Sequence, residues 1–193
     1  NDILKQQGEI TPGDTGNKKN GEGVTSLYEW VEAAIFSLVC VVLVFSFLFR
    51  IVGVDGESMM NTLIHQDRLI LEDFMYTPQR GDIVVVNRYT QEPIVKRIIA
   101  VGGDTIEIDP ETYEVILNGQ VLDEPYLDVK TPPREMDGPV TIPEGHVFVM
   151  GDNRGNSQDS RYDIPGLRFI DERDIMGKAV YRIWPFDSIG GLY

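Results

Sequence analysis

An apolar run near the N-terminus constrains this chain more than any other feature of its sequence. Ala33 to Phe49 contains 17 residues without a charge, and Glu32 and Arg50 stand at its two ends. As a helix, the run would span roughly 26 Å at about 1.5 Å per residue, against a hydrocarbon core of about 30 Å. The sequence therefore predicts one transmembrane helix over residues 29–52, preceded by a polar, glycine-rich and disordered tail at residues 1–28.

Two other interpretations of the apolar run are a buried core helix and the apolar part of a cleavable signal peptide. A core helix normally has a polar face, and the apolar region of a signal peptide is shorter and is followed by a small-residue cleavage site. We therefore expect an uncleaved, single-pass anchor in the lipid bilayer of the cell membrane. Lys18 and Lys19 precede the run and Arg50 follows it, so the positive-inside rule favours a cytoplasmic N-terminus by one charge.

Residues 53–193 consist of short β-type runs separated by turn signals, and this pattern predicts a mainly β domain. The runs are Leu69–Leu71, Ile83–Val86, Ile94–Val101, Thr105–Ile108 and Val147–Met150. A hairpin is predicted at 113–122, because Asn118-Gly119 is typical of tight hairpin turns. The acidic, proline-rich segment 123–143 should form an irregular loop, so that about 105–143 makes a hairpin and loop subdomain.

The composition argues against several functions. The formal net charge is −14, which makes nucleic acid a poor partner, because binding phosphates requires clustered Lys and Arg. The single cysteine, Cys40, lies within the predicted anchor, and His65 and His146 are far apart in the sequence. We therefore expect neither a disulfide, nor a metal site, nor a cofactor.

A serine hydrolase needs a base, and the chain offers two kinds. His65 and His146 lack the partner signature of a catalytic histidine, and an ordinary surface or structural role fits each of them. Lys96 lies in a β-branched apolar run, where desolvation would lower its pKa from about 10.4 and allow it to accept a proton. The alternative is an edge lysine that opposes aggregation, and the local spacing does not decide between the two.

Two further segments carry polar groups suited to catalysis. Ser58 follows the anchor closely, and Gly56 before it permits a close backbone approach, so that the Ser58 amide could face a developing oxyanion. The segment Gly145–Arg161 runs from a strand into a loop rich in side chains that bond to their own backbone or form charge-assisted pairs. Such a loop is suited to a rigid scaffold behind an active site.

Taken in order, these segments resemble the type I signal peptidases, which are serine proteases with a Ser/Lys dyad. The family motifs match Ser58-Met59 with Thr62-Leu63, Arg80 to Val85, Lys96-Arg97 with Gly103-Asp104, and Gly151 to Arg161. The resemblance implies an antiparallel, signal-peptidase-like β catalytic domain after one transmembrane helix. It also implies a membrane-bound serine endopeptidase that cleaves signal peptides from secretory preproteins after small residues, in the pattern Ala-x-Ala.

The resemblance also assigns roles to individual residues. Ser58 would be the acylated nucleophile and an oxyanion donor through its amide, Lys96 the general base, and Ser157 the hydroxyl that orients the lysine. Asp159 and Arg161 would form a supporting ion pair. The apolar pockets for small substrate residues would be lined by Val52, Val54, Met59, Leu63 and Val95.

The sequence departs from the family pattern in places, and two rival functions stay open. Gly56 stands where some relatives have a second, serine oxyanion donor, and Asn61 and Gly102 stand where prolines are usual. A self-cleaving Ser/Lys regulator would need a DNA-binding module, which the sequence does not show. A membrane-tethered β domain that binds peptides without cleaving them would have no working dyad.

Overall fold

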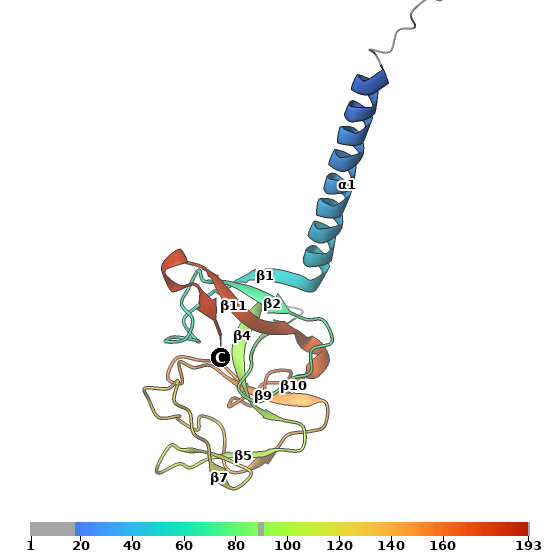
Figure 1. Cartoon of the computed structure of the whole chain (residues 1–193). Coiled ribbons are helices and arrows are strands. Elements are labelled where there is room, and N and C mark those ends of the chain that lie inside the picture. The colour runs from blue at the N-terminus through green and yellow to red at the C-terminus, as the bar shows by residue number, and fades with distance from the viewer. Residues whose placement is uncertain (1–17, 89–90, 193) are drawn as a thin grey trace, which may run out of the picture. The chain divides into compact units, whose positions relative to one another are not determined.

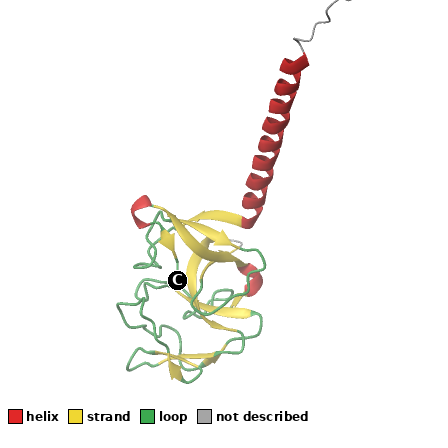
Figure 2. Cartoon of the chain, viewed as in Figure 1, coloured by secondary structure: helices red, strands yellow, loops and turns green. Residues whose placement is uncertain are grey.

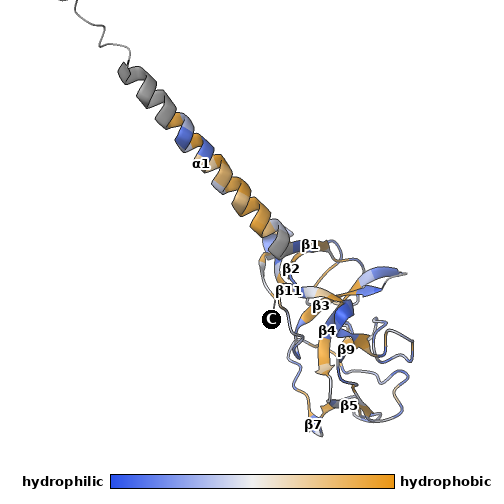
Figure 3. Ribbon diagram, turned by 90° about the vertical axis from the view of Figure 1, so that its right-hand side faces the viewer, coloured by the Kyte–Doolittle hydropathy of each residue, from blue (hydrophilic) through white to orange (hydrophobic). Residues whose placement is uncertain are grey.

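The computed structural model describes residues 18–88 and 91–192, and the chain divides after Phe45 into two units, each described by itself (Figure 1). The first unit is formed by helix α1 (Lys18–Leu48), which continues into the first residues of the second. Its segment Leu27–Ser46 has 20 residues with a mean hydropathy of 2.0, long and apolar enough to cross a membrane. Figure 3 shows most of this segment in the hydrophobic colour, and none of it is buried against the described protein, which argues against a core helix.

The ends of the helix differ from the predicted boundaries. The predicted tail lies outside the described residues up to Asn17, and from Lys18 onward the chain is helical rather than irregular. Extending an existing helix is easier than starting one, because each added residue gains a hydrogen bond without a new nucleus. At the other end α1 stops at Leu48, four residues before the predicted end of the anchor, and strand β1 (Phe49–Gly53) follows.

The helix ends earlier than the predicted anchor because an apolar run does not by itself distinguish a helix from a strand. Strand β1 pairs antiparallel with β2 (Arg68–Glu72), and Val52 lies opposite Leu69 in this register. The partner strand satisfies the backbone groups of β1, and that long-range pairing is invisible in the local hydrophobic pattern.

The second unit contains two antiparallel sheets connected by long loops, and the larger sheet has eight strands (Figure 2). Their order is β1-β2-β11-β3-β4-β9-β10, with β12 paired to β11, and every pair is antiparallel. The remaining strands are β3 (Ile83–Arg88), β4 (Gln91–Val101), β9 (His146–Met150), β10 (Ile170–Asp171), β11 (Ile175–Trp184) and β12 (Gly190–Gly191). Two short 3₁₀ helices, η1 (Glu172–Asp174) and η2 (Phe186–Ser188), flank β11.

The smaller sheet contains the predicted hairpin. Its order is β7-β6-β5-β8, formed by β5 (Thr105–Ile108), β6 (Val115–Leu117), β7 (Gln120–Val121) and β8 (Val140–Thr141). Asn118 and Gly119 connect β6 to β7 with φ values of 51° and 78°, the left-handed conformation that a two-residue hairpin turn requires. The predicted irregular segment 123–143 has no strand other than the two residues of β8.

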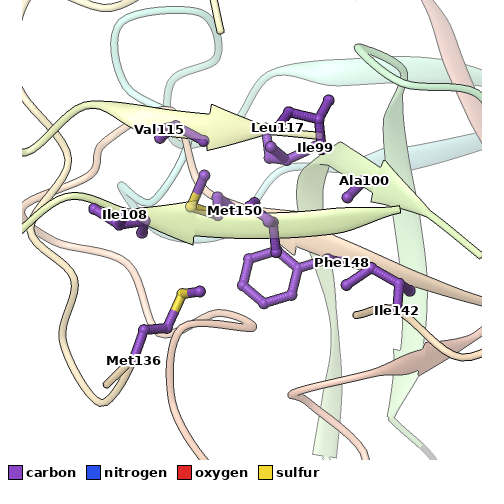
Figure 4. Close-up of a cluster of buried hydrophobic side chains, with 10 residues drawn as sticks. Ile99, Ala100, Ile108, Val115, Leu117, Met136, Ile142, Phe148 and Met150 are labelled. Atoms are coloured by element: carbon purple, nitrogen blue, oxygen red, sulfur yellow. The ribbon is translucent and has the colours of Figure 1, made fainter. Parts of the chain in front are cut away.

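A hydrophobic cluster joins the two sheets (Figure 4). Ile108, Val115 and Leu117 of the smaller sheet pack with Phe148 and Met150 of β9 in this cluster, and Phe148 and Met150 are fully buried. A buried side chain of this size contributes about 1.5–3 kcal/mol, so the cluster fixes the smaller sheet to the strands that lead to the site. The predicted mainly β fold is confirmed, and the five predicted runs lie within β2, β3, β4, β5 and β9.

Candidate active site

Lys96 lies in the interior of the larger sheet. Strand β4 runs between β3 and β9, and Lys96 is opposite Val84 of β3. Only 3% of the residue is exposed. Its Nζ donates to Ser58 Oγ at 2.6 Å and to the carbonyl oxygen of Val95 at 3.2 Å. The serine and the lysine that the sequence singled out are therefore in direct hydrogen-bond contact, although 38 positions separate them.

Burial lowers the pKa of Lys96 to about 8. The dominant cause is desolvation, which disfavours the charged ammonium in a site closed to water. The carboxylate of Asp159 partly opposes this effect, whereas the positive charges of Arg88 and Arg161 add to it. A lysine with this pKa is neutral in about a tenth of the molecules at pH 7 and can then accept a proton, whereas an ordinary lysine is neutral in fewer than about one molecule in a thousand.

Ser58 lies in a loop that connects β1 to β2. The loop is closed at its base by hydrogen bonds from Val54 N to Asp67 O at 2.8 Å and from Gln66 N to Val54 O at 2.9 Å. Arg182 of β11 donates to the carbonyl oxygen of Thr62 at 3.2 Å and to Asp67 Oδ2 at 3.1 Å. The loop therefore has no strand partner at Ser58, and hydrogen bonds at its base and at Thr62 hold it.

The loop that begins at Gly151 lies directly against the nucleophile segment. The backbone N–H of Asn153 donates to the carbonyl oxygen of Ser58 at 3.0 Å. A Cβ at Gly151 would lie 2.3 Å from the same carbonyl oxygen and 2.3 Å from Ser157 Oγ. Only glycine permits so close an approach between the two loops.

Ser157 is near the pair but is not bonded to the lysine. Its Oγ is buried and forms no hydrogen bond with Lys96, and its hydroxyl instead helps to lower the pKa of the Asp159 carboxyl. The resemblance predicts that this hydroxyl orients Lys96, and the contact that would do so is not made in the structure.

Three buried ion pairs lie behind the site. Arg161 makes a two-pronged contact with Asp159, at 2.8 Å from both Nε and Nη2, and both side chains are fully buried. The predicted ion pair is therefore present as a contact. Although burial alone would raise the pKa of Asp159, the hydrogen bonds and charge of Arg161 hold it below the ordinary value.

The other two pairs were not assigned a role from the sequence. Arg97 donates from Nε to Asp152 Oδ1 at 2.9 Å and from Nη2 to Asp152 Oδ2 at 2.7 Å. Asp152 Oδ2 accepts a further hydrogen bond from Thr62 Oγ1 at 2.5 Å. A signal existed here, because an arginine in the middle of an apolar strand needs an acidic partner when it is buried.

The remaining pair reaches into the acidic segment. Arg154 binds Glu124 through both ends of its guanidinium and donates to the carbonyl oxygen of Gly151 at 3.1 Å. Nothing in the local sequence marks Glu124 among the acidic residues around it. We call the three ion pairs, Arg161–Asp159, Arg97–Asp152 and Arg154–Glu124, the wall of the site. The wall is rigid, since a charge-assisted two-pronged contact fixes geometry as well as charge.

The predicted pocket side chains come together in one cluster beside the pair. Val54, Met59, Leu63 and Val95 are buried there, and Val52 is half-buried against them. Leu69 and Leu71 of β2 pack in the same cluster. The side chains are therefore adjacent to the site, while their role in holding a substrate remains a prediction.

His65 belongs to the same β1–β2 loop as Ser58, whereas His146 begins strand β9. His65 Nδ1 accepts a hydrogen bond from Gly56 N at 3.4 Å, and His146 Nδ1 lies 3.0 Å from the carbonyl oxygen of Glu144. Neither of these contacts involves Ser58. Over the described ranges, no cluster of three His, Cys, Asp or Glu side chains is arranged to hold a metal ion.

The fold and the site together define a class of protein: a peptidase with an apolar N-terminal helix, an antiparallel β domain and a serine in contact with a buried lysine. Residues 27–184 match the family described as signal peptidase, peptidase S26. The chain belongs to this family. The family prediction is confirmed, and with it the activity of a signal peptidase, a serine endopeptidase anchored in the membrane.

Several relatives are similar over most of their length. Signal peptidase I of Bacillus licheniformis is 37% identical over 192 residues, which cover 93% of this chain and 98% of the relative. Signal peptidase I P of Bacillus subtilis subsp. natto is 38% identical over 86% of this chain and 93% of its own length. A crystal structure of a signal peptidase I from Enterococcus faecalis is 29% identical, with a TM-score of 0.44, and covers 54% of this chain and 98% of that one.

Proposed function

We propose that this chain cleaves preproteins by acyl transfer, with Ser58 as nucleophile and Lys96 as general base. The observation that carries this proposal is the 2.6 Å contact between Lys96 Nζ and Ser58 Oγ, made by a lysine whose pKa burial lowers to about 8. Proton transfer to a base within hydrogen-bond reach is the geometry that activates a serine.

The proposed reaction has two stages. Neutral Lys96 takes the proton of Ser58 Oγ as the oxygen bonds to the scissile carbonyl carbon. The resulting ammonium then gives that proton to the leaving nitrogen as the C–N bond breaks. This frees the mature protein and leaves the signal peptide as an ester on Ser58. Lys96 next deprotonates a water that attacks the ester, and the proton returns to Ser58 Oγ when the C–O bond breaks.

Supporting roles follow from the neighbouring groups. The Ser58 N–H is a donor for the oxyanion, because among the described residues it has no hydrogen-bond partner. Ser157 would orient the ammonium of Lys96 once that charge forms, since its hydroxyl is buried and lies against Gly151, which also faces the Ser58 carbonyl. Asp159 and Arg161 would keep the wall behind the lysine rigid.

The substrate would bind as an extended strand beside the nucleophile. Val52, Val54, Met59, Leu63 and Val95 would line shallow apolar pockets for the first and third residues before the cut. Such pockets accept small side chains, so that the preferred substrates would be signal peptides ending in Ala-x-Ala. Neither a metal ion nor a nucleic acid has a part in this reaction.

For the membrane topology we propose a single-pass protein of the cell membrane. The helix that contains Leu27–Ser46 would cross the bilayer, with the N-terminus cytoplasmic and residues 53–193 forming the extracytoplasmic catalytic domain. Access to preproteins that emerge from the membrane requires the site on that side.

The test is processing of an Ala-x-Ala preprotein in membranes that contain the full chain. Ser58→Ala and Lys96→Met should both abolish cleavage, because each removes a reacting group, whereas the matched controls Ser188→Ala and Lys130→Met should cleave at the wild-type rate. Wild-type cleavage by both Ser58→Ala and Lys96→Met would refute the assignment. Binding of the preprotein without any cleavage by the wild type would favour the rival, a peptide-binding domain.

A further inference from the structure

One residue of the Gly151–Arg161 loop holds both peptide units that flank the Cα of Ser58. Asn153 Nδ2 donates to the carbonyl oxygen of Glu57 at 3.1 Å, and Asn153 N donates to the carbonyl oxygen of Ser58 at 3.0 Å. The Glu57 carbonyl also accepts from Met60 N at 3.1 Å. The peptide unit that carries the Ser58 N–H is therefore fixed through its carbonyl end.

The direction of the Ser58 N–H follows from the planarity of the peptide bond. The Glu57–Ser58 bond is trans, so its N–H and its C=O point in opposite directions. Because the carbonyl points at the Asn153 carboxamide, the N–H points away from the loop. It makes no hydrogen bond within the described ranges and is a free donor beside the nucleophilic oxygen.

We propose that Asn153 is a positioning residue that aims the oxyanion donor. Its carboxamide holds the Glu57 carbonyl and thereby directs the Ser58 N–H at the substrate oxygen on which negative charge develops. This inference rests on the proposed function, since it takes Ser58 as the nucleophile. Gly56 has no side chain that could donate to the same oxygen, so stabilisation of the oxyanion depends more strongly on the direction of the Ser58 N–H.

The first test compares Asn153→Ala and Asn153→Asp with the matched control Asn156→Ala. Both Asn153 variants keep the backbone N–H and lose the Nδ2 donor, and the aspartate keeps the size of the side chain. Asn156 Nδ2 donates instead to the exposed Glu57 carboxylate at 3.3 Å. We expect kcat to fall roughly 10- to 100-fold in both Asn153 variants with KM unchanged, as for a weakened transition-state contact. Asn156→Ala should cleave at the wild-type rate.

A second readout separates aiming from a merely structural role. A peptide boronate forms a tetrahedral, negatively charged adduct with the serine, and its affinity should fall by the same factor as kcat/KM in the Asn153 variants. The affinity for a peptide with an N-methylated, uncleavable scissile bond should stay unchanged, as should the pH midpoint of the rate and the unfolding temperature. Equal loss of affinity for both peptides would overturn the aiming role.

The failures of the two proposals are distinguishable. If Asn153→Ala keeps the wild-type kcat and boronate affinity while Ser58→Ala is inactive, Asn153 does not aim the donor and the proposed function stands. If Ser58→Ala keeps cleaving, the proposed function is wrong, and the role of Asn153 falls with it.

Discussion

The two halves of the proposed dyad are held in different ways. Lys96 lies in β4, with strands on both sides, and is almost fully buried. Ser58 lies in a loop without a strand partner, and the contacts next to it come from Asn153 and, through Thr62, from Asp152, which is 90 positions away from Thr62. The difference teaches that the sheet sets the chemistry of the base, through burial, whereas contacts between loops set the geometry of the nucleophile.

This contrast predicts opposite consequences for substitutions on the two sides. Removing a buried contact on the loop side should chiefly destabilise the fold or misplace the serine, and it should also move the pH dependence only where the removed group is charged, as at Arg161. Changing a charge near the lysine should move the pH dependence without changing the maximal rate. The following predictions test that division, from the largest expected effect to the smallest.

Arg161→Met should cause the largest loss of stability on the loop side. It leaves the fully buried carboxylate of Asp159 without its two-pronged partner, and breaking such a pair typically costs roughly 3–5 kcal/mol. Chemical denaturation measures the change in the free energy of unfolding. The matched control is Arg173→Gln, because the Arg173 side chain is 87% exposed in its contact with Asp171 and such pairs contribute about 0–1 kcal/mol. Equal effects of the two substitutions would contradict a rigid, buried wall.

Lys96→Met should do the reverse and stabilise the domain at neutral pH. Lowering the pKa from 10.5 to about 8 means that folding disfavours the ammonium by roughly 3 kcal/mol, at about 1.4 kcal/mol per unit. The penalty applies in full below the folded pKa of about 8 and disappears as the pH rises through the unfolded value of 10.5. The free energy of unfolding of the wild type and of Lys96→Met, measured at pH 7 and above pH 10.5, checks this. If the substitution stabilises the domain equally at both pH values, the effect is not electrostatic.

Gly151→Ala should impair cleavage with little change in the pH dependence. The new Cβ would meet Ser58 O and Ser157 Oγ at 2.3 Å each, so that the loops must separate, and a displacement of about 1 Å at a reacting group can cost roughly 100-fold in rate. Gly155→Ala is the matched control in the same loop, since its Cβ would meet no atom within 4 Å. Comparable rates for the two variants would show that the loops are not in contact as described.

The smallest effect concerns Arg88, whose positive charge contributes to lowering the pKa of Lys96. Because only the neutral lysine accepts a proton, the rate should fall as the pH drops below about 8. Arg88→Gln should raise the pKa of Lys96 and so move the acidic limb of the pH–rate profile to higher pH by less than about one unit. The maximal rate at high pH should stay the same. The control is Arg68→Gln, on the exposed side of β2. A rate independent of pH in the wild type would mean that lysine is not the base.

Much of the fold could be predicted because it depends on local patterns. The alternation and turn signals located five strands, and Asn118-Gly119 located a hairpin. The end of the helix at Leu48 could not be predicted, since the apolar residues that follow belong to a strand whose partner, β2, begins at Arg68. The same holds for the site. Ser58 and Lys96 could be predicted because they lie in recognisable motifs, whereas nothing in the local sequence distinguishes Glu124 from the acidic residues around it.

By itself the sequence determined the reactive groups, the anchor and the order of the strands along the chain. Each of these is encoded in residues close together in the sequence, through hydrophobic periodicity or a short motif. Only the tertiary structure decided that Lys96 is buried and lies 2.6 Å from Ser58. It alone brought Asn153 onto the peptide unit of the nucleophile. Desolvation and hydrogen-bond direction depend on what surrounds a group in space, and here most of those surroundings come from distant parts of the chain.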